Sequence, residues 1–116
     1  MSAATHTPGN LARQHCRPCT AATQPLSQDQ INTLLKQLDG WAQQGSVISK
    51  TFDFTNYHQA ISFVNAVAWV SNHEDHHPEL TVSYNKCKVE YTTHAVNGLS
   101  ENDFICAAKV DALLTI

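Results

Sequence analysis

Pro78 is the residue that most constrains how this chain can fold. Proline lacks a backbone N–H and clashes with the preceding helical turn, and it moves the residue before it out of the helical region. An apolar, helix-like segment precedes it, capped by Thr55 or Asn56 and running to about His73. The helix must therefore end near His76, which places His76 and His77 at or just past its C-terminus.

The chain has 7 histidines in 116 residues, as many as lysine and arginine together. Histidine is the side chain whose free pKa lies nearest neutrality, so a cluster of histidines indicates proton transfer. His94 follows His76 by 18 residues, and a hairpin of that length can return it to the segment that entered it. We therefore predict that His76, His77 and His94 share one pocket, where Asp75 could orient or charge one ring. The other four histidines are expected to be incidental or, for His73, a solvated helix-end residue.

Hydrophobic periodicity predicts three helices and two strand pairs in the order α-β-β-α-β-β-α. Residues 27–30 have the form of a capping box for a first helix that ends at Asp39-Gly40. Two short strands follow in 41–54, and a second pair lies in 80–94 with a turn at Asn85-Lys86. The last helix begins at Ser100. Hairpin-paired strands with helices on one face predict an α+β domain on an antiparallel sheet.

The central helix is expected to present one apolar stripe to its neighbours. Tyr57, Ile61, Val64 and Ala68 form this stripe, and a second set widens it: Phe63, Val67 and Val70. The helix carries few charges, so it is expected to pack on the sheet and on another subunit.

Composition separates the chain into two parts and excludes several classes of protein. Residues 1–25 lack apolar periodicity and are expected to form a poorly ordered arm, with the folded domain at 26–116. The net charge is −3, which argues against a basic nucleic-acid-binding face. No apolar run approaches the roughly 20 residues that span a bilayer, and no secretory h-region is present, so a cytoplasmic location is expected.

The four cysteines fall into two groups. Cys16 and Cys19 form a C-x-x-C, which could be half of a zinc site or a redox pair, but no second half follows. We interpret them as exposed thiols of the arm, and Cys87 and Cys106 as small buried hydrophobic residues.

A metal site is the main alternative for the histidines. Residues 73–77 contain H-E-x-x-H, so His73 and His77 could bind zinc, with His94 as a third ligand. That motif needs continuous helix through its second histidine, and Pro78 directly follows it. The sequence therefore favours a site without metal.

The same residues resemble the pterin-4a-carbinolamine dehydratases. The resemblance rests on Glu74 to Leu80, on Thr92-Thr93-His94 and on Gly98 to Asp103, and it runs from about Ser27 to Leu114. It implies a four-stranded antiparallel sheet with helices on one side, assembled as a dimer or a dimer of dimers. It also implies dehydration of 4a-hydroxytetrahydropterin to quinonoid dihydropterin, which regenerates the cofactor of aromatic amino-acid hydroxylases.

Carried over by position, the resemblance assigns catalysis to His76, His77 and His94. It places pterin contacts on Asp75, Thr92 and Thr93, besides the histidines, and support on Pro78 and Asp103. Pterin is the substrate, and no separate cofactor is expected. Some animal members also act as a dimerisation cofactor for a transcription factor, which leaves a protein-binding role as an alternative.

Two positions depart from the family pattern. Asn72 stands where many members carry an acidic residue, and Leu80 stands where many have an aromatic one. Neither is expected to touch the histidines.

Overall fold

The computed structural model describes residues 10–114. A short 3-10 helix, η2 (Leu11–Arg13), comes first. The helices α1 (Gln28–Leu35), α2 (Tyr57–Glu74) and α3 (Glu101–Ala112) alternate with two strand pairs. These strands are β1 (Ala42–Gln44), β2 (Val47–Asp53), β3 (Glu79–Ser83) and β4 (Lys86–Tyr91), and a second 3-10 helix, η3 (His94–Val96), follows β4.

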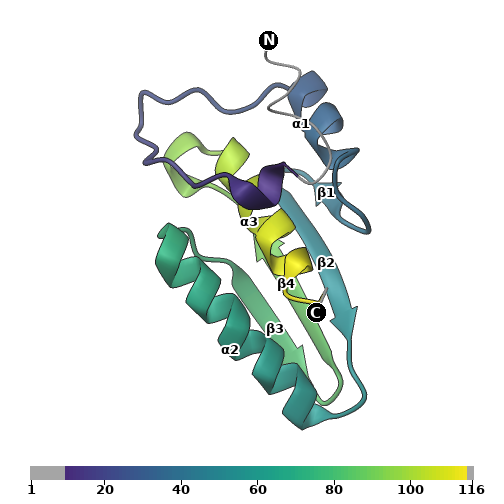
Figure 1. The fold of residues 1–116 in the computed structure, drawn as a ribbon. Helices are drawn as coiled ribbons and strands as arrows, with labels where there is room; N and C mark the ends of the chain where they lie inside the picture. The colour runs from purple at the N-terminus through teal and green to yellow at the C-terminus, as the bar shows by residue number, and fades with distance from the viewer. Residues whose placement is uncertain (1–9, 115–116) are drawn as a thin grey trace.

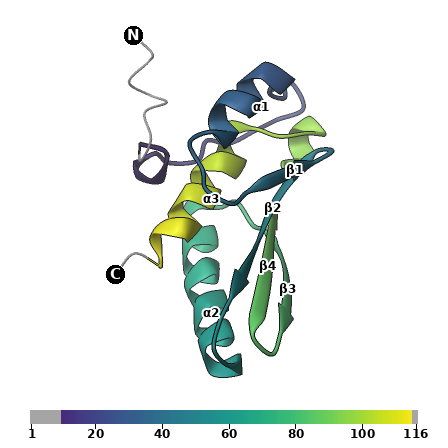
Figure 2. The ribbon, with the colours of Figure 1, turned by 90° about the vertical axis from the view of Figure 1, so that its right-hand side faces the viewer.

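The four strands form one antiparallel sheet in the order β1-β2-β4-β3. Helices α2 and α3 lie against one face of this sheet, as the turned view shows (Figure 2). The α+β class, the element order and the placement of the helices agree with the sequence-based expectation.

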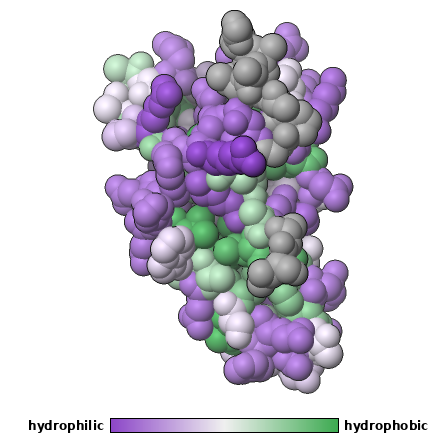
Figure 3. All heavy atoms as spheres, viewed as in Figure 1, coloured by the Kyte–Doolittle hydropathy of each residue, from purple (hydrophilic) through white to green (hydrophobic). Residues whose placement is uncertain are grey.

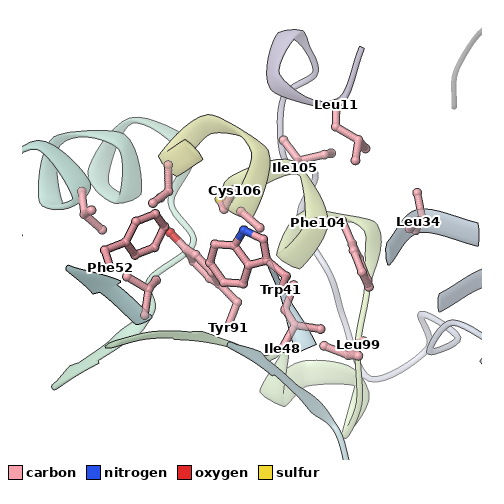
Figure 4. Packing of buried hydrophobic residues seen from close by; sticks show 14 of the residues in the cluster. Leu11, Leu34, Trp41, Ile48, Phe52, Tyr91, Leu99, Phe104, Ile105 and Cys106 are labelled. Carbon is pink, nitrogen blue, oxygen red and sulfur yellow. The ribbon is translucent and has the colours of Figure 1, made fainter. Parts of the chain in front are cut away.

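The core lies between the sheet and α3. Tyr91, Trp41 and Phe52 meet here, with ring centroids 6.1 to 6.3 Å apart for the two pairs that include Trp41 (Figure 4). Alternate residues of β4 point into this core, because successive side chains of a strand face opposite sides. Cys87 and Cys106 are both fully buried, which confirms their interpretation as small hydrophobic residues.

Residues 10–19 pack on the domain, whereas the sequence had suggested a poorly ordered arm over residues 1–25; residues 20–25 are exposed. Leu11 is 1% exposed and belongs to the core cluster, and the Lys109 ammonium donates to the carbonyl of Ala12 at 2.9 Å. The chain then runs past the C-terminal end of α2 before it turns back to α1 (Figure 1). The sequence did not predict this packing, because apart from Leu11 the contacts are mainly polar and involve the backbone. Residues 1–9 of the expected arm lie outside the described residues.

Three local expectations need correction. The buried face of α2 is formed by Ala60, Phe63, Val67 and Val70, whereas Tyr57, of the other stripe, is exposed. These four residues are buried because this side of α2 faces both the sheet and α3, and Val64 packs at its edge. The hairpin turn between β3 and β4 is at positions 84 and 85, one residue earlier than expected, and α1 ends at Leu35 and continues as a turn.

The face seen in Figure 3 has an apolar centre with polar side chains above and below. A groove of about 350 Å³ runs here between the start of α2 and the end of α3, and its apolar lining includes Phe54, Phe63 and Leu113. Within residues 10–114, no helix combines the length and the hydropathy needed to cross a bilayer.

Candidate active site

The end of α2 places the two adjacent histidines. Asp75 caps the helix in the left-handed conformation, with φ 52° and ψ 42°, and the amides of Asp75 and His76 both bond to the carbonyl of Ser71. This turn ends the helix at Glu74, as the position of Pro78 requires. Aspartate is one of the few residues besides glycine that tolerate this conformation, because its short side chain can bond to the nearby backbone.

His76 is held by a buried carboxylate. Its Nε2 lies 2.6 Å from Oδ1 of Asp103, whose side chain is fully buried. The second carboxylate oxygen, Oδ2, accepts from the Thr93 hydroxyl at 2.7 Å and from the backbone amide of Ser100 at 2.9 Å. The Ser100 hydroxyl lies 2.8 Å from that of Thr93 and completes the chain of donors. Asp103 therefore accepts three hydrogen bonds, an arrangement suited to its ionised form.

Tyr91 supports the His76 ring from the side. The two rings stack with centroids 5.7 Å apart and an interplanar angle of 10°. Tyr91 is fully buried, and burial raises the pKa of its phenol. Because stacking fixes the plane of the imidazole and Asp103 fixes one of its nitrogens, His76 is confined to one orientation. Within residues 10–114 its other nitrogen, Nδ1, has no hydrogen-bond partner.

His77 is exposed, and its Nε2 lies 3.2 Å from Oδ1 of Asn72. The prediction that Asn72 does not touch the histidines is therefore wrong. The two residues are five apart, a spacing that a continuous helix would not bring together. They meet because the left-handed turn at Asp75 folds His77 back along the last turn of α2. Asn72, which stands where many members of the family that the sequence resembles carry an acidic residue, therefore changes the immediate surroundings of His77.

His94 was expected to be the last residue of a strand, but it lies beyond the end of β4. Strand β4 ends at Tyr91, and Thr93 then forms an isolated bridge with Gly98. His94 begins the short helix η3 that this bridge closes, and its side chain is exposed. Asn97 ends η3 in the left-handed conformation, which allows the tight return to α3.

One cavity of about 550 Å³ brings the expected residues together. Its lining includes six residues that the sequence singled out: Asp75, His76, His77, Thr92, Thr93 and His94. Asp103 lies behind His76, outside the lining. Thr93 is buried and donates to Asp103, and the Thr92 hydroxyl bonds to the carbonyl of Ser46. That these residues bind or transform a substrate stays a prediction.

Part of the cavity wall comes from a segment that the sequence pattern did not assign to the site. Residues 16–19 form this part of its lining, together with Asn102. The C-x-x-C had drawn attention to this segment, but for its thiols and not for its position. Glu74 also belongs to the lining, and its carboxylate binds the same segment.

The alternative metal site is not assembled. His73 stacks on Trp69, with centroids 5.2 Å apart, and does not converge with His77 and His94. Among residues 10–114, the ligand atoms that lie within 4.8 Å of one another belong to His15, His73 and Glu74. Glu74 there already pairs with His15, and the Lys109 ammonium lies 3.6 Å away, which disfavours a divalent cation.

The family model described as pterin 4 alpha carbinolamine dehydratase matches residues 24–113. A relative from Nitrosospira multiformis is 62% identical over 107 residues, covering 92% of this chain and 95% of its own. A relative from Nitrosomonas eutropha is 59% identical, covering 90% and 94%. Both bear the provisional name pterin-4-alpha-carbinolamine dehydratase. The chain belongs to this family of dehydratases, which are lyases that eliminate water.

Solved structures show the same fold. A Brucella melitensis protein described as a transcriptional coactivator/pterin dehydratase superposes with a TM-score of 0.75 at 33% identity, covering 78% of this chain and 98% of its own. A pterin dehydratase-like protein, identified as a RuBisCO assembly factor in the alpha-carboxysome, superposes with a TM-score of 0.56 at 27% identity. The latter match covers 64% of this chain and 88% of that protein.

Proposed function

We propose that this protein dehydrates 4a-hydroxytetrahydropterin to quinonoid dihydropterin by histidine acid–base catalysis. In this reaction the N5–H bond and the C4a–O bond of the substrate break, a C4a=N5 double bond forms, and water leaves. The reaction needs a base at N5 and an acid at the departing hydroxyl. Imidazoles supply both near neutral pH without a metal or another cofactor.

The observation that carries the proposal is the hydrogen bond between His76 and the buried Asp103. With the hydrogen on Nε2 donated to Asp103, the Nδ1 lone pair remains to accept a proton. The carboxylate then stabilises the imidazolium that forms. We therefore assign the base to His76.

His77 and His94 are the candidates for the acid. Both are exposed, and both line the main cavity as well as a smaller one of about 50 Å³ beside it. An imidazolium at either position would donate to the leaving hydroxyl and recover its proton from solvent. Asp75 and Thr92, on the same lining, are proposed to contact the pterin. A cavity of this size falls within the range typical of small-molecule sites.

The direct test is an assay of carbinolamine decay, with the substrate generated in place and the uncatalysed rate subtracted. We expect purified protein to accelerate the decay and to keep its activity after exhaustive chelation of metal ions. Decay no faster than in buffer would contradict the proposal, and loss of activity on chelation would contradict its metal-free chemistry.

We also propose that the protein forms a homodimer or homotetramer and takes its substrate from an aromatic amino-acid hydroxylase, whose cofactor is restored once a reductase has reduced the quinonoid product. The exposed aromatic residues of α2 support the assembly, since Trp69 is 67% exposed and Tyr57 is 52% exposed. Sedimentation equilibrium of the full chain tests this part, and a monomer at micromolar concentration would contradict it.

A further inference from the structure

We infer that residues 15–19, here called the strap, form a wall of the substrate pocket, held in place by Glu74 and Asn102. The strap then sets the affinity for substrate, while His76 and Asp103 set the rate of the chemical step. The inference rests on the proposed function, because it assigns a second role within the same pocket. It concerns a segment outside residues 24–113, the part that the family model matches.

Asn102 is the first anchor, at the start of α3. Its Oδ1 accepts from the Arg17 amide at 3.0 Å, and its Nδ2 donates to the Arg17 carbonyl at 2.6 Å. The same amide nitrogen lies 3.5 Å from the Cys19 sulfur. Asn102 is only 7% exposed. Within residues 10–114, all the hydrogen bonds of its side-chain amide go to the strap. Removing the strap would leave both of its polar atoms without protein partners.

Glu74 is the second anchor, at the end of α2. Its Oε1 accepts from the Cys16 amide at 2.7 Å, and its Oε2 accepts from Nδ1 of His15 at 2.9 Å. Burial alone would raise the pKa of this carboxyl, but the two hydrogen bonds and the nearby Lys109 charge hold the pKa below its ordinary value. A buried carboxylate is stable only when paired, and the strap supplies both of its hydrogen-bond donors.

The two anchors adjoin the catalytic pair in sequence. Glu74 lies two residues before His76, and Asn102 lies directly before Asp103. The strap therefore bridges the two elements that carry the proposed base and its carboxylate. The sulfurs of Cys16 and Cys106 lie 3.5 Å apart and add a further contact between the strap and α3.

The strap presents Arg17, Pro18 and Cys19 to the cavity, from a part of the chain different from that of the histidines. Arg17 and Pro18 are exposed at its rim. The strap would thus enclose a substrate on the side of the cavity that the histidines do not form, and it adds no histidine to the lining. Contacts of this kind hold the ground state and the transition state equally, so their loss raises KM and leaves kcat nearly constant.

The test is a comparison of three variants of the full chain. Asn102→Ala removes the first anchor, and loss of its paired hydrogen bonds is expected to raise KM about 10-fold with kcat within about twofold of wild type. Pro18→Gly loosens the strap at an exposed position without disturbing the core, and should raise KM about 2- to 5-fold. Pro25→Gly is the matched control, since Pro25 is also exposed but does not line the cavity, and should leave KM unchanged.

Amide hydrogen exchange supplies a readout that does not depend on turnover. The Cys16 and Arg17 amides should exchange slowly in wild type and faster in Asn102→Ala, and a bound dihydropterin should slow both further. If Asn102→Ala and Pro18→Gly both keep the wild-type KM, the strap is not a wall of the site. Equal falls in kcat and kcat/KM would likewise overturn the inference. If wild type lacks dehydratase activity, the proposed function fails, and slow exchange at Cys16 and Arg17 still decides whether the anchors hold the strap.

Discussion

His76 and Asp103 are joined by a hydrogen bond of 2.6 Å, although they lie 27 residues apart and belong to different elements. His76 follows the end of α2, and Asp103 lies in the first turn of α3. The sheet brings these two ends together, with Tyr91 of β4 against the imidazole. The carboxylate thus fixes both the orientation of the ring and the nitrogen that carries its hydrogen.

Asp103→Asn should lower kcat by about 100-fold or more, because the amide no longer stabilises an imidazolium and can force the other tautomer on His76. Steady-state kinetics of the carbinolamine reaction measure this effect. Asp53→Asn is the matched control, since Asp53 is exposed and, within residues 10–114, its ion pair is with the exposed Lys86. Wild-type kcat in Asp103→Asn would show that the base does not act through this pair.

Asn72→Asp should shift the pH dependence of the reaction toward higher pH. A carboxylate at this position would face Nε2 of His77, now 3.2 Å from the Asn72 amide oxygen, and would favour the imidazolium. If His77 is the acid, its charged form then persists to higher pH and the alkaline limb of the kcat profile moves upward. The same profile in wild type and variant would assign the acid to His94 instead.

The strap should be released in acid. The pKa of Glu74 lies below the ordinary carboxyl value of about 4.3, so its contribution to stability is fully present above that value. The contribution is lost as the pH falls through the lower, folded-state pKa. The protection factor of the Cys16 amide should therefore fall in wild type as the pH drops through the lowered pKa of Glu74. Glu74→Gln, which keeps an acceptor but no charge, should lose this acid-induced step, and an unchanged step in that variant would contradict the assignment.

Tyr91→Phe should leave the free energy of unfolding within about 1 kcal/mol of wild type. The Tyr91 hydroxyl is buried and has no hydrogen-bond partner within residues 10–114, so its removal deletes no bond. The ring that stacks on His76 remains. Chemical denaturation measures the stability, and a loss of more than about 2 kcal/mol would reveal a partner for this hydroxyl.

The sequence predicted the elements whose signals are local. The capping box at Ser27 and Gln30 forms as expected, with the Gln30 side chain accepting from the Ser27 amide at 2.8 Å. Pro78 correctly indicated that α2 ends just before the adjacent histidines. In β4 the buried residues Val89 and Tyr91 alternate with more exposed ones, because successive side chains of a strand face opposite sides.

The features that the sequence did not predict depend on contacts between distant segments, and such contacts leave no periodic pattern in the sequence. Nothing local in residues 15–19 indicates that Asn102 receives their backbone. The contact between Asn72 and His77 depends on the left-handed turn at Asp75, which residue type alone does not predict. Which part of the widened apolar stripe of α2 is buried depends on the position of α3, and that position follows only from the assembled fold.

The central claim is tested most directly by measuring kcat for carbinolamine dehydration in wild type and in His76→Gln. Glutamine keeps a polar side chain of similar reach but cannot accept and return a proton near neutral pH. We predict strong acceleration by wild type and a kcat in His76→Gln that is lower by about 100-fold or more, with the fold retained. A His76→Gln variant as active as wild type would contradict the assignment of His76 as the base.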